Sequence, residues 1–195
     1  MELKLLAGSV LGLNSRCEVR PDMVRTVVLN YVYLDPTTQE RFDRAAEELG
    51  WGTVNLIRQT VQAFLKVNRD YYVAAALADC KARGMDQRDH FRILRDHGED
   101  GLRPYAAERP LFGESPLASV PAVPTKEDYR RRCSNLTLGD YNAVLLGVVR
   151  IVDQGSLAQV LSKIIRQHFQ KYWEANYASQ IELAELGLYR REENG

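Results

Sequence analysis

The side chains best suited to metal binding or acid–base chemistry are three histidines, and two of them, His90 and His97, lie close in sequence to Asp86 and Asp89. A metal site on a helix needs ligands about one turn apart. His90 and His97 are seven residues apart and have no cysteine or further histidine one turn away. His168 lies among basic and amide side chains, which indicates a surface position. We therefore expect no metal site and no catalytic histidine.

Nucleophilic and cofactor chemistry has equally little support. The sequence contains no glycine-rich phosphate loop, no Gly-x-Ser-x-Gly elbow and no pair of carboxylates at a recognisable catalytic spacing. Cys17, Cys80 and Cys133 are too few and too scattered for a disulfide framework or a Cys-x-x-Cys zinc site. These features predict a protein that is not an enzyme and needs no cofactor, and they favour the reducing cytoplasm.

Because the chain has no formal net charge, only local stretches of basic residues can indicate a nucleic-acid partner. The sequence holds 26 basic and 26 acidic residues, so its formal net charge is zero, whereas nucleic-acid-binding domains are commonly basic. Arg25 opens one segment rich in β-forming residues, and Arg130, Arg131 and Arg132 lead into another. Such basic stretches either contact phosphate or form an ordinary solvated surface, and both alternatives remain open.

Prolines divide the chain. Five of its seven prolines fall within residues 104–124, together with Gly113, Ser115 and Ser119. Proline and glycine interrupt the periodicity of both helices and strands. We therefore expect a linker over residues 104–124 between a first unit, 1–103, and a second unit, 125–195.

The first unit has the pattern of a strand followed by helices. Residues 25–34 are rich in β-branched and aromatic side chains, and Asp35-Pro36 supplies an N-cap and a first helical residue. That helix has one apolar face and ends at Gly50. Thr53 is the expected N-cap of a second helix, which continues to Gly84 and precedes a short helix over residues 86–96.

The second unit repeats this order. Residues 131–138 end in a strand-like alternation, and a helix opens at Gly139-Asp140. Gly155-Ser156 closes that helix and caps the last one, which extends from residue 157 to at least residue 177. The interval from the end of the strand to the cap of the second helix is 19 residues in the first unit and 18 in the second.

These lengths and caps resemble the ribbon-helix-helix family of DNA-binding proteins, the Arc and MetJ superfamily, over residues 25–68 and 131–171. The resemblance implies a mainly α fold with tandem units whose strands pair in a two-stranded antiparallel ribbon, with long helical extensions. One strand and one helix pair bury too little surface to be stable alone. The second unit is therefore supplied either by the same chain, as a pseudo-dimer, or by a second copy in a homodimer.

The resemblance also implies which side chains meet DNA, because in this family outward strand residues enter the major groove and helix N-termini bind phosphate. The outward residues of the second strand would be Arg131, Cys133, Asn135 and Thr137, with Ser134, Leu136 and Leu138 facing the core. The phosphate clamps would be Ser156 and Leu157 in the second unit and Thr53, Val54 and Asn55 in the first. The basic flanks would be Arg25, Arg130 and Arg132.

The first strand departs from this pattern. The same alternation places Leu29, Tyr31 and Tyr33 outward and leaves Asn30 in the core between Val28 and Val32. Three alternatives follow: the tyrosine hydroxyls contact phosphates, a bulge shifts the register, or protein covers this strand.

The sequence thus favours a sequence-selective regulator of transcription or plasmid maintenance whose partner is double-stranded DNA. The alternative is a helical interaction or scaffold protein with the same core and no DNA contact, which would oligomerise or bind a partner through the long helices. We expect the aromatic residues of those helices to pack against one another. No apolar run is long enough to span a bilayer, and residues 1–13 are expected to form a strand or docking segment, so we expect no membrane association.

Overall fold

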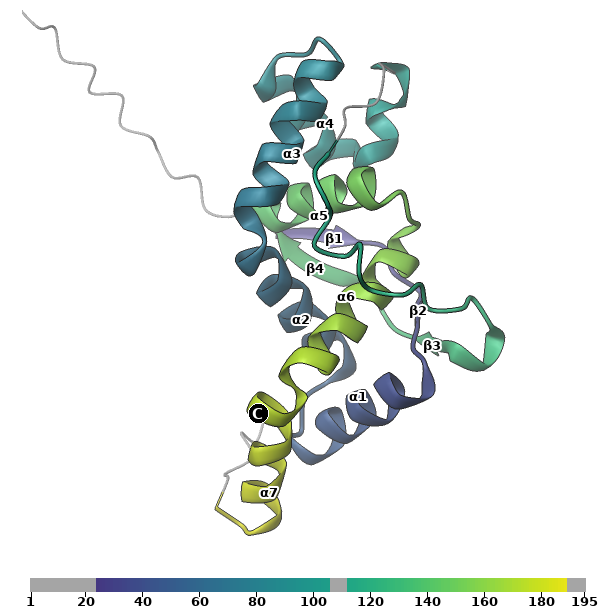
Figure 1. Ribbon diagram of the computed structural model, residues 1–195, viewed down its shortest axis with the longest axis vertical. Coiled ribbons are helices and arrows are strands. Elements are labelled where there is room, and N and C mark those ends of the chain that lie inside the picture. The colour runs from purple at the N-terminus through teal and green to yellow at the C-terminus, as the bar shows by residue number, and fades with distance from the viewer. Residues whose placement is uncertain (1–23, 106–111, 189–195) are drawn as a thin grey trace, which may run out of the picture.

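The structure is a computed structural model that describes residues 24–105 and 112–188 (Figure 1). The segment 1–13 discussed above lies outside the described residues. The described part of the chain is mainly helical, as predicted, with four short strands. The elements of the first unit are β1 (Val24–Val27), β2 (Tyr31–Tyr33), α1 (Pro36–Glu48), α2 (Thr53–Val67), α3 (Arg69–Ala82), α4 (Gln87–His97) and a 3-10 turn (Glu99–Tyr105). Those of the second are a 3-10 turn (Glu127–Tyr129), β3 (Arg130–Arg132), β4 (Leu136–Gly139), α5 (Asp140–Asp153), α6 (Leu157–Tyr172), a π-helical segment (Trp173–Ala178) and α7 (Ser179–Glu185).

The strands of the two units pair with each other in antiparallel orientation. β1 lies beside β4 with Val27 opposite Leu136, and β2 lies beside β3 with Tyr31 opposite Arg132. The two pairings share one register, because three residues separate the paired segments on each side. The amide of Cys133 bridges the gap by donating to the Asn30 carbonyl at 3.0 Å. We call residues 24–33 and 130–139 the ribbon, and it forms within one chain.

The side of the ribbon that faces the core changes near its middle. Val32 and Leu34 are buried, as the predicted alternation requires, but Leu29 is also buried, at 3% exposure. Asn30 is exposed, and so is Val28, at 68%. The prediction that Leu29 faces outward and Asn30 inward is therefore wrong. A shift of one residue reverses every side chain that follows, and here it falls where both strands leave the regular ladder.

On the second strand, the side that faces the core also changes in the gap between β3 and β4. Leu136 and Leu138 are buried, as predicted. Ser134, predicted to face the core, is exposed. At the β3 end, Arg130 and Arg132 are exposed while Arg131 is less so. Both strands thus change phase together, which leaves their pairing register intact.

Local caps fix the helix starts. Asp35 caps α1 by accepting from the Thr38 amide at 3.2 Å, with Pro36 as the first helical residue. Ser156 caps α6 and forms a capping box with Gln159. Both caps were predicted. The cap of α2 is Gly52 rather than Thr53, and no side chain caps this helix. With this correction, the interval from Leu34 to Gly52 equals that from Leu138 to Ser156, so the two units agree in spacing.

The two units share one hydrophobic cluster, which includes Leu34 and Leu65 from the first and Leu138 and Ile165 from the second. At its centre α2 packs against α6, and α1 also packs against α6 (Figure 1). The rings of Phe42 and Phe169 meet edge to face with centroids 5.8 Å apart. Burial of this apolar surface is the main favourable contribution to folding.

The helical extensions differ from prediction in one respect. The helix expected to continue from Thr53 to Gly84 is broken at Asn68, whose φ of −104° and ψ of 16° lie outside the helical range, and α3 starts at the next residue. The short helix expected over residues 86–96 is α4. The last helix extends past Tyr177, as expected, but through a π-helical segment into α7.

The proline-rich stretch is docked on the second unit. Residues 112–124 run across α6 (Figure 1), and Leu117 in this stretch is fully buried. The Gln167 side-chain amide donates to the Pro116 carbonyl at 2.8 Å. This stretch therefore contributes to the core that both units share.

Candidate nucleic-acid interface

Two half-buried tyrosines and two exposed arginines form one face at the β2–β3 end of the ribbon. Tyr31 lies directly opposite Arg132, and Tyr33 directly opposite Arg130, and directly opposed residues of a ladder project to the same side. The Arg130 guanidinium carbon lies 4.2 Å from the centre of the Tyr31 ring, and the two tyrosine rings meet edge to face at 5.4 Å. We call these four residues the tyrosine–arginine face.

The arginines of this face are available to a ligand. Arg130 forms an ion pair with Glu127 at 3.2 Å, and both side chains are well exposed. Within the described residues Arg132 forms no ion pair, and it is exposed. An exposed ion pair contributes little stability, so a phosphate or a base edge can replace Glu127 at small cost.

Arg131, predicted to read bases, lies on the other side of the ribbon. Its guanidinium forms an ion pair with Asp43 of α1 at 2.6 Å. The same group lies 5.5 Å from the centre of the buried Phe42 ring. The prediction that Arg131 faces outward is therefore corrected, because the change of phase turns this side chain toward α1.

The other predicted readers of the second strand are only partly available. The side-chain oxygen of Asn135 accepts from the Leu29 amide at 3.2 Å, so it replaces a missing ladder bond in the gap. Cys133 is half-buried, and burial raises the pKa of its thiol, which keeps the thiol neutral. Thr137 lies opposite Thr26 in the β1–β4 pairing.

The β1–β4 end of the ribbon has a neutral outer face. Val24 and Thr26 are exposed there. The one nearby cation predicted as a basic flank, Arg25, is bound between two carboxylates, Asp96 at 2.8 Å and Asp140 at 3.0 Å. A hydrogen bond from Arg95 lowers the pKa of Asp96 to about 2, so this carboxylate is ionised at neutral pH. Arg25 is therefore neutralised by side chains that the sequence did not associate with it.

The predicted phosphate clamp at the start of α6 faces a groove lined by three carboxylates and three arginines. Leu157 lines this groove together with Asp96, Glu99 and Asp100, which come from the end of α4 and the turn that follows. Arg150, also in the groove, forms an ion pair with Glu99. A helix N-terminus favours an anion, but the arginines beside this one are already paired with carboxylates.

The other predicted clamp lies at the start of α2, where Thr53, Val54 and Asn55 form the first turn. The Asn55 side-chain oxygen accepts from Arg58 within the same turn. This terminus thus has a cation beside it, in contrast to the start of α6.

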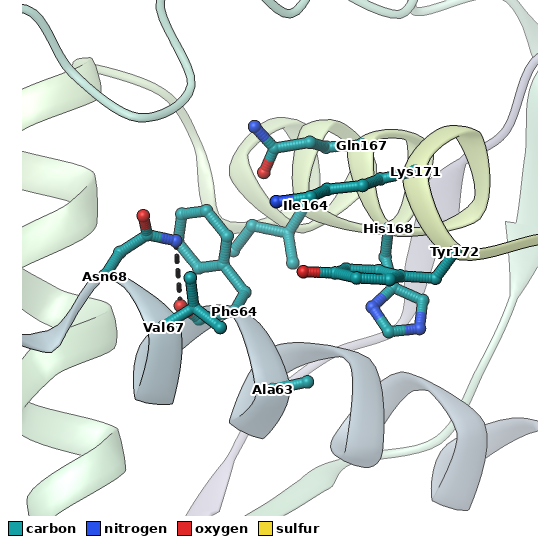
Figure 2. Close-up of a pocket in the computed structure, with 9 residues that line it drawn as sticks. All are labelled: Ala63, Phe64, Val67, Asn68, Ile164, Gln167, His168, Lys171 and Tyr172. Atoms are coloured by element: carbon teal, nitrogen blue, oxygen red, sulfur yellow. Dashed lines mark hydrogen bonds between the residues drawn. The ribbon is translucent and has the colours of Figure 1, made fainter. Parts of the chain in front are cut away.

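A pocket between the last turns of α2 and α6 contains His168, which the sequence placed on the surface. Figure 2 shows Lys171 and Tyr172 of α6 extending toward Asn68 at the end of α2. The Nε2 atom of His168 lies 2.8 Å from the Tyr177 hydroxyl. Burial lowers the pKa of His168 to about 4, so its imidazole is neutral at physiological pH.

Aromatic residues pack against one another within each extension, whereas packing between the two extensions was predicted. The Trp173 and Tyr177 rings are stacked with centroids 5.9 Å apart, and Trp51 meets Tyr177 at 6.0 Å. Tyr71 and Tyr72 meet edge to face at 5.1 Å. The contact between Trp51 and Tyr177 joins the C-terminal helical segment to the turn between α1 and α2.

A buried polar group between α3 and α4 was missed in the sequence. His90 Nε2 and Asp79 Oδ2 are 2.8 Å apart, and Arg83 also binds this carboxylate. Burial alone would raise the pKa of Asp79, but hydrogen bonds from His90 and Arg83 lower it overall. The two residues lie on different helices, so no local pattern marks the pair. Among the described residues no three side chains form a group that could hold a metal ion.

No protein-family model, curated protein or solved structure matches this chain. Among the described helices, none is by itself long and apolar enough to cross a membrane. The stretch from α5 to α7 reaches that length and composition only across a bend of 97°.

Proposed function

We propose that this chain is a sequence-selective DNA-binding protein of the ribbon-helix-helix type, acting as a regulator of transcription or plasmid maintenance. The observation that carries the proposal is the tyrosine–arginine face, an exposed pair of arginines opposite a pair of tyrosines on a two-stranded ribbon. The major groove of B-form DNA admits a two-stranded ribbon. Arginine is the side chain that most often reads guanine there.

The chemistry of each side chain suits this role. A guanidinium presents a planar set of donors that matches the O6 and N7 acceptors of guanine or two phosphate oxygens. A tyrosine hydroxyl can donate to a phosphate oxygen. Stacking of Arg130 on Tyr31 holds the guanidinium in place before DNA arrives, which reduces the conformational entropy lost on binding.

The layout of the helices supports the same assignment. In each unit a strand leads into a first helix, and a second helix starts 17 residues after the first one begins. The four helices of these two units share one core beneath the ribbon. Such an arrangement leaves the outer side of the ribbon to meet a partner.

The test is selection of bound sequences from random duplex DNA, followed by titration of the recovered sequence at two salt concentrations. Arg130→Ala with Arg132→Ala should weaken binding by at least about tenfold, because each arginine contact to a base contributes about 1–3 kcal/mol. The slope of log affinity against log salt should fall by about 0.9 for each phosphate that the variant no longer neutralises.

The matched control removes two arginines elsewhere. Arg92 and Arg103 are exposed and each pairs with an aspartate three residues earlier on the surface. Replacing both by alanine changes the net charge equally and should leave binding within about twofold, since neither side chain belongs to the tyrosine–arginine face. Equal weakening in the two double variants would show nonspecific electrostatic attraction, and absence of any enrichment at low salt would refute the proposal.

A second candidate is a protein-interaction role. Val24 and Val28 are 66% and 68% exposed on the outer side of the β1 end, and exposed apolar groups near a strand edge can pair with another chain. If selection recovers no DNA motif, this surface becomes the candidate binding site.

A further inference from the structure

We infer that one chain recognises one asymmetric DNA half-site, through the β2–β3 end of the ribbon alone, so that a single chain does not occupy both halves of a palindrome. This inference rests on the proposed DNA binding. A symmetric dimer presents the same reading residues at both ends of its ribbon, so its operator repeats as two half-sites about 10 base pairs apart. In this chain the two ends come from different sequences.

Equivalent positions of the two units carry different side chains. Thr26 and Arg130 each stand ten residues before the first helix of their unit, and Val28 and Arg132 each stand eight residues before it. The arginines of the tyrosine–arginine face therefore correspond to a threonine and a valine at the other end. Neither threonine nor valine can form the bidentate contact to guanine that arginine forms.

The two ends of the ribbon also differ in how their arginines are paired. At the β1–β4 end Arg25 is held between Asp96 and Asp140. The adjacent groove holds Asp96, Glu99 and Asp100 together with Arg25, Arg95 and Arg150, and each of these arginines pairs with a carboxylate. DNA phosphates approaching this end meet arginines that are already paired. At the other end they meet Arg130, whose ion pair with Glu127 is exposed, and Arg132, which forms no ion pair within the described residues. Neutralisation of phosphates by cations supplies most of the affinity of a protein for DNA, so only one end provides it.

The change of the core-facing side within the ribbon also separates its two ends. On the first strand the outward residues are Thr26 and Val28 before the gap and Tyr31 and Tyr33 after it. The regular ladder is interrupted at residues 28–30 and 133–135. Figure 1 shows β2 and β3 turning away from the direction of β1 and β4. The ribbon therefore consists of two short ladders rather than one regular reading surface.

The experiment combines selection from random duplex DNA with native mass spectrometry of the full chain on the recovered duplex. We expect a motif without internal two-fold symmetry, shorter than one helical turn of about 10 base pairs, bound by one chain. A palindrome that binds two chains, one on each half, gives the same ratio of one chain to one half-site. A palindrome with both halves occupied by a single chain would overturn the inference.

A pair of variants tests the two ends directly. Thr26→Ala with Val28→Ala should keep affinity within about twofold, whereas Arg130→Ala with Arg132→Ala should weaken it by at least about tenfold. Equal weakening of DNA binding by the two double variants would overturn the inference, while the proposal that the chain binds DNA would still stand. No binding by the unaltered chain at low salt would refute the proposed function itself, and the inference with it. Circular dichroism of each variant shows that the fold is retained, and all the substituted side chains are exposed.

Discussion

The two ends of the ribbon differ less in backbone than in what surrounds them. At both ends the directly opposed residues follow one register. In both units the second helix starts 17 residues after the first. At the β1–β4 end, however, α4 brings Asp96 against Arg25, and the groove beside the start of α6 holds as many carboxylates as arginines. At the β2–β3 end the arginines remain exposed. A repeated fold therefore does not repeat its surface, because the surface depends on elements that only one unit contains.

The largest expected effect is the loss of stability when a charge is placed on the inner side of the ribbon rather than on its outer side. Leu136 is fully buried, so Leu136→Asp should destabilise the protein by at least about 4 kcal/mol and unfold it, because an unpaired charge would be buried. Val28→Asp, on the outer side, should change stability by less than about 0.5 kcal/mol. Urea unfolding followed by circular dichroism measures both. Similar stability in the two variants would contradict the observed phase of the ribbon.

The next largest effect concerns His168 in the pocket of Figure 2. Its pKa is lowered to about 4, from an ordinary value near 6.5. Between these pH values the unfolded chain binds a proton that the folded chain does not, so stability should fall as the pH drops from about 6.5 to about 4. This group would contribute on the order of 2 to 3 kcal/mol to that fall.

His168→Gln isolates this contribution. The variant should show a flatter dependence of unfolding free energy on pH across that interval, measured by urea unfolding at several pH values. All other titrating groups are common to the two proteins, so their contributions cancel in the difference. An unchanged slope would show that His168 takes up a proton equally well in the folded state.

Two adjacent arginines should separate stability from DNA affinity. Arg131→Ala removes the ion pair with Asp43 and the contact with Phe42, and we expect a loss of about 1 kcal/mol of stability. Arg132→Ala should leave thermal stability unchanged and weaken DNA binding. Thermal melts and fluorescence anisotropy of both variants check this. A loss of affinity only in the Arg131 variant would place the reading face on the opposite side.

The smallest effect tests why the β1–β4 end is neutral. Asp96→Asn removes one partner of Arg25 while Asp140 remains, so DNA affinity should stay within about twofold, as expected when one exposed charge is removed. Filter binding and footprinting measure this. A footprint extended at the β1–β4 end would show that Asp96 alone prevents this end from contacting DNA.

The sequence by itself determined the helical class of the protein and most helix starts. Asp35-Pro36 and Gly155-Ser156 act within a few residues of themselves, so their effect can be read locally. The buried positions Leu136 and Leu138 also followed from simple alternation. The misplaced cap at Gly52 shows the limit of such signals, since Thr53 is an equally good cap by residue type.

The tertiary structure alone decided which side chains are available to a partner. Arg25 meets Asp96 and Asp140, and Arg131 meets Asp43, all of them far away in the chain. The reversal at Leu29 and Asn30 depends on both strands leaving the ladder together, which neither strand specifies alone. Burial and ion pairing arise from packing between distant segments, and a periodic pattern in one segment carries no information about the charge of its neighbour.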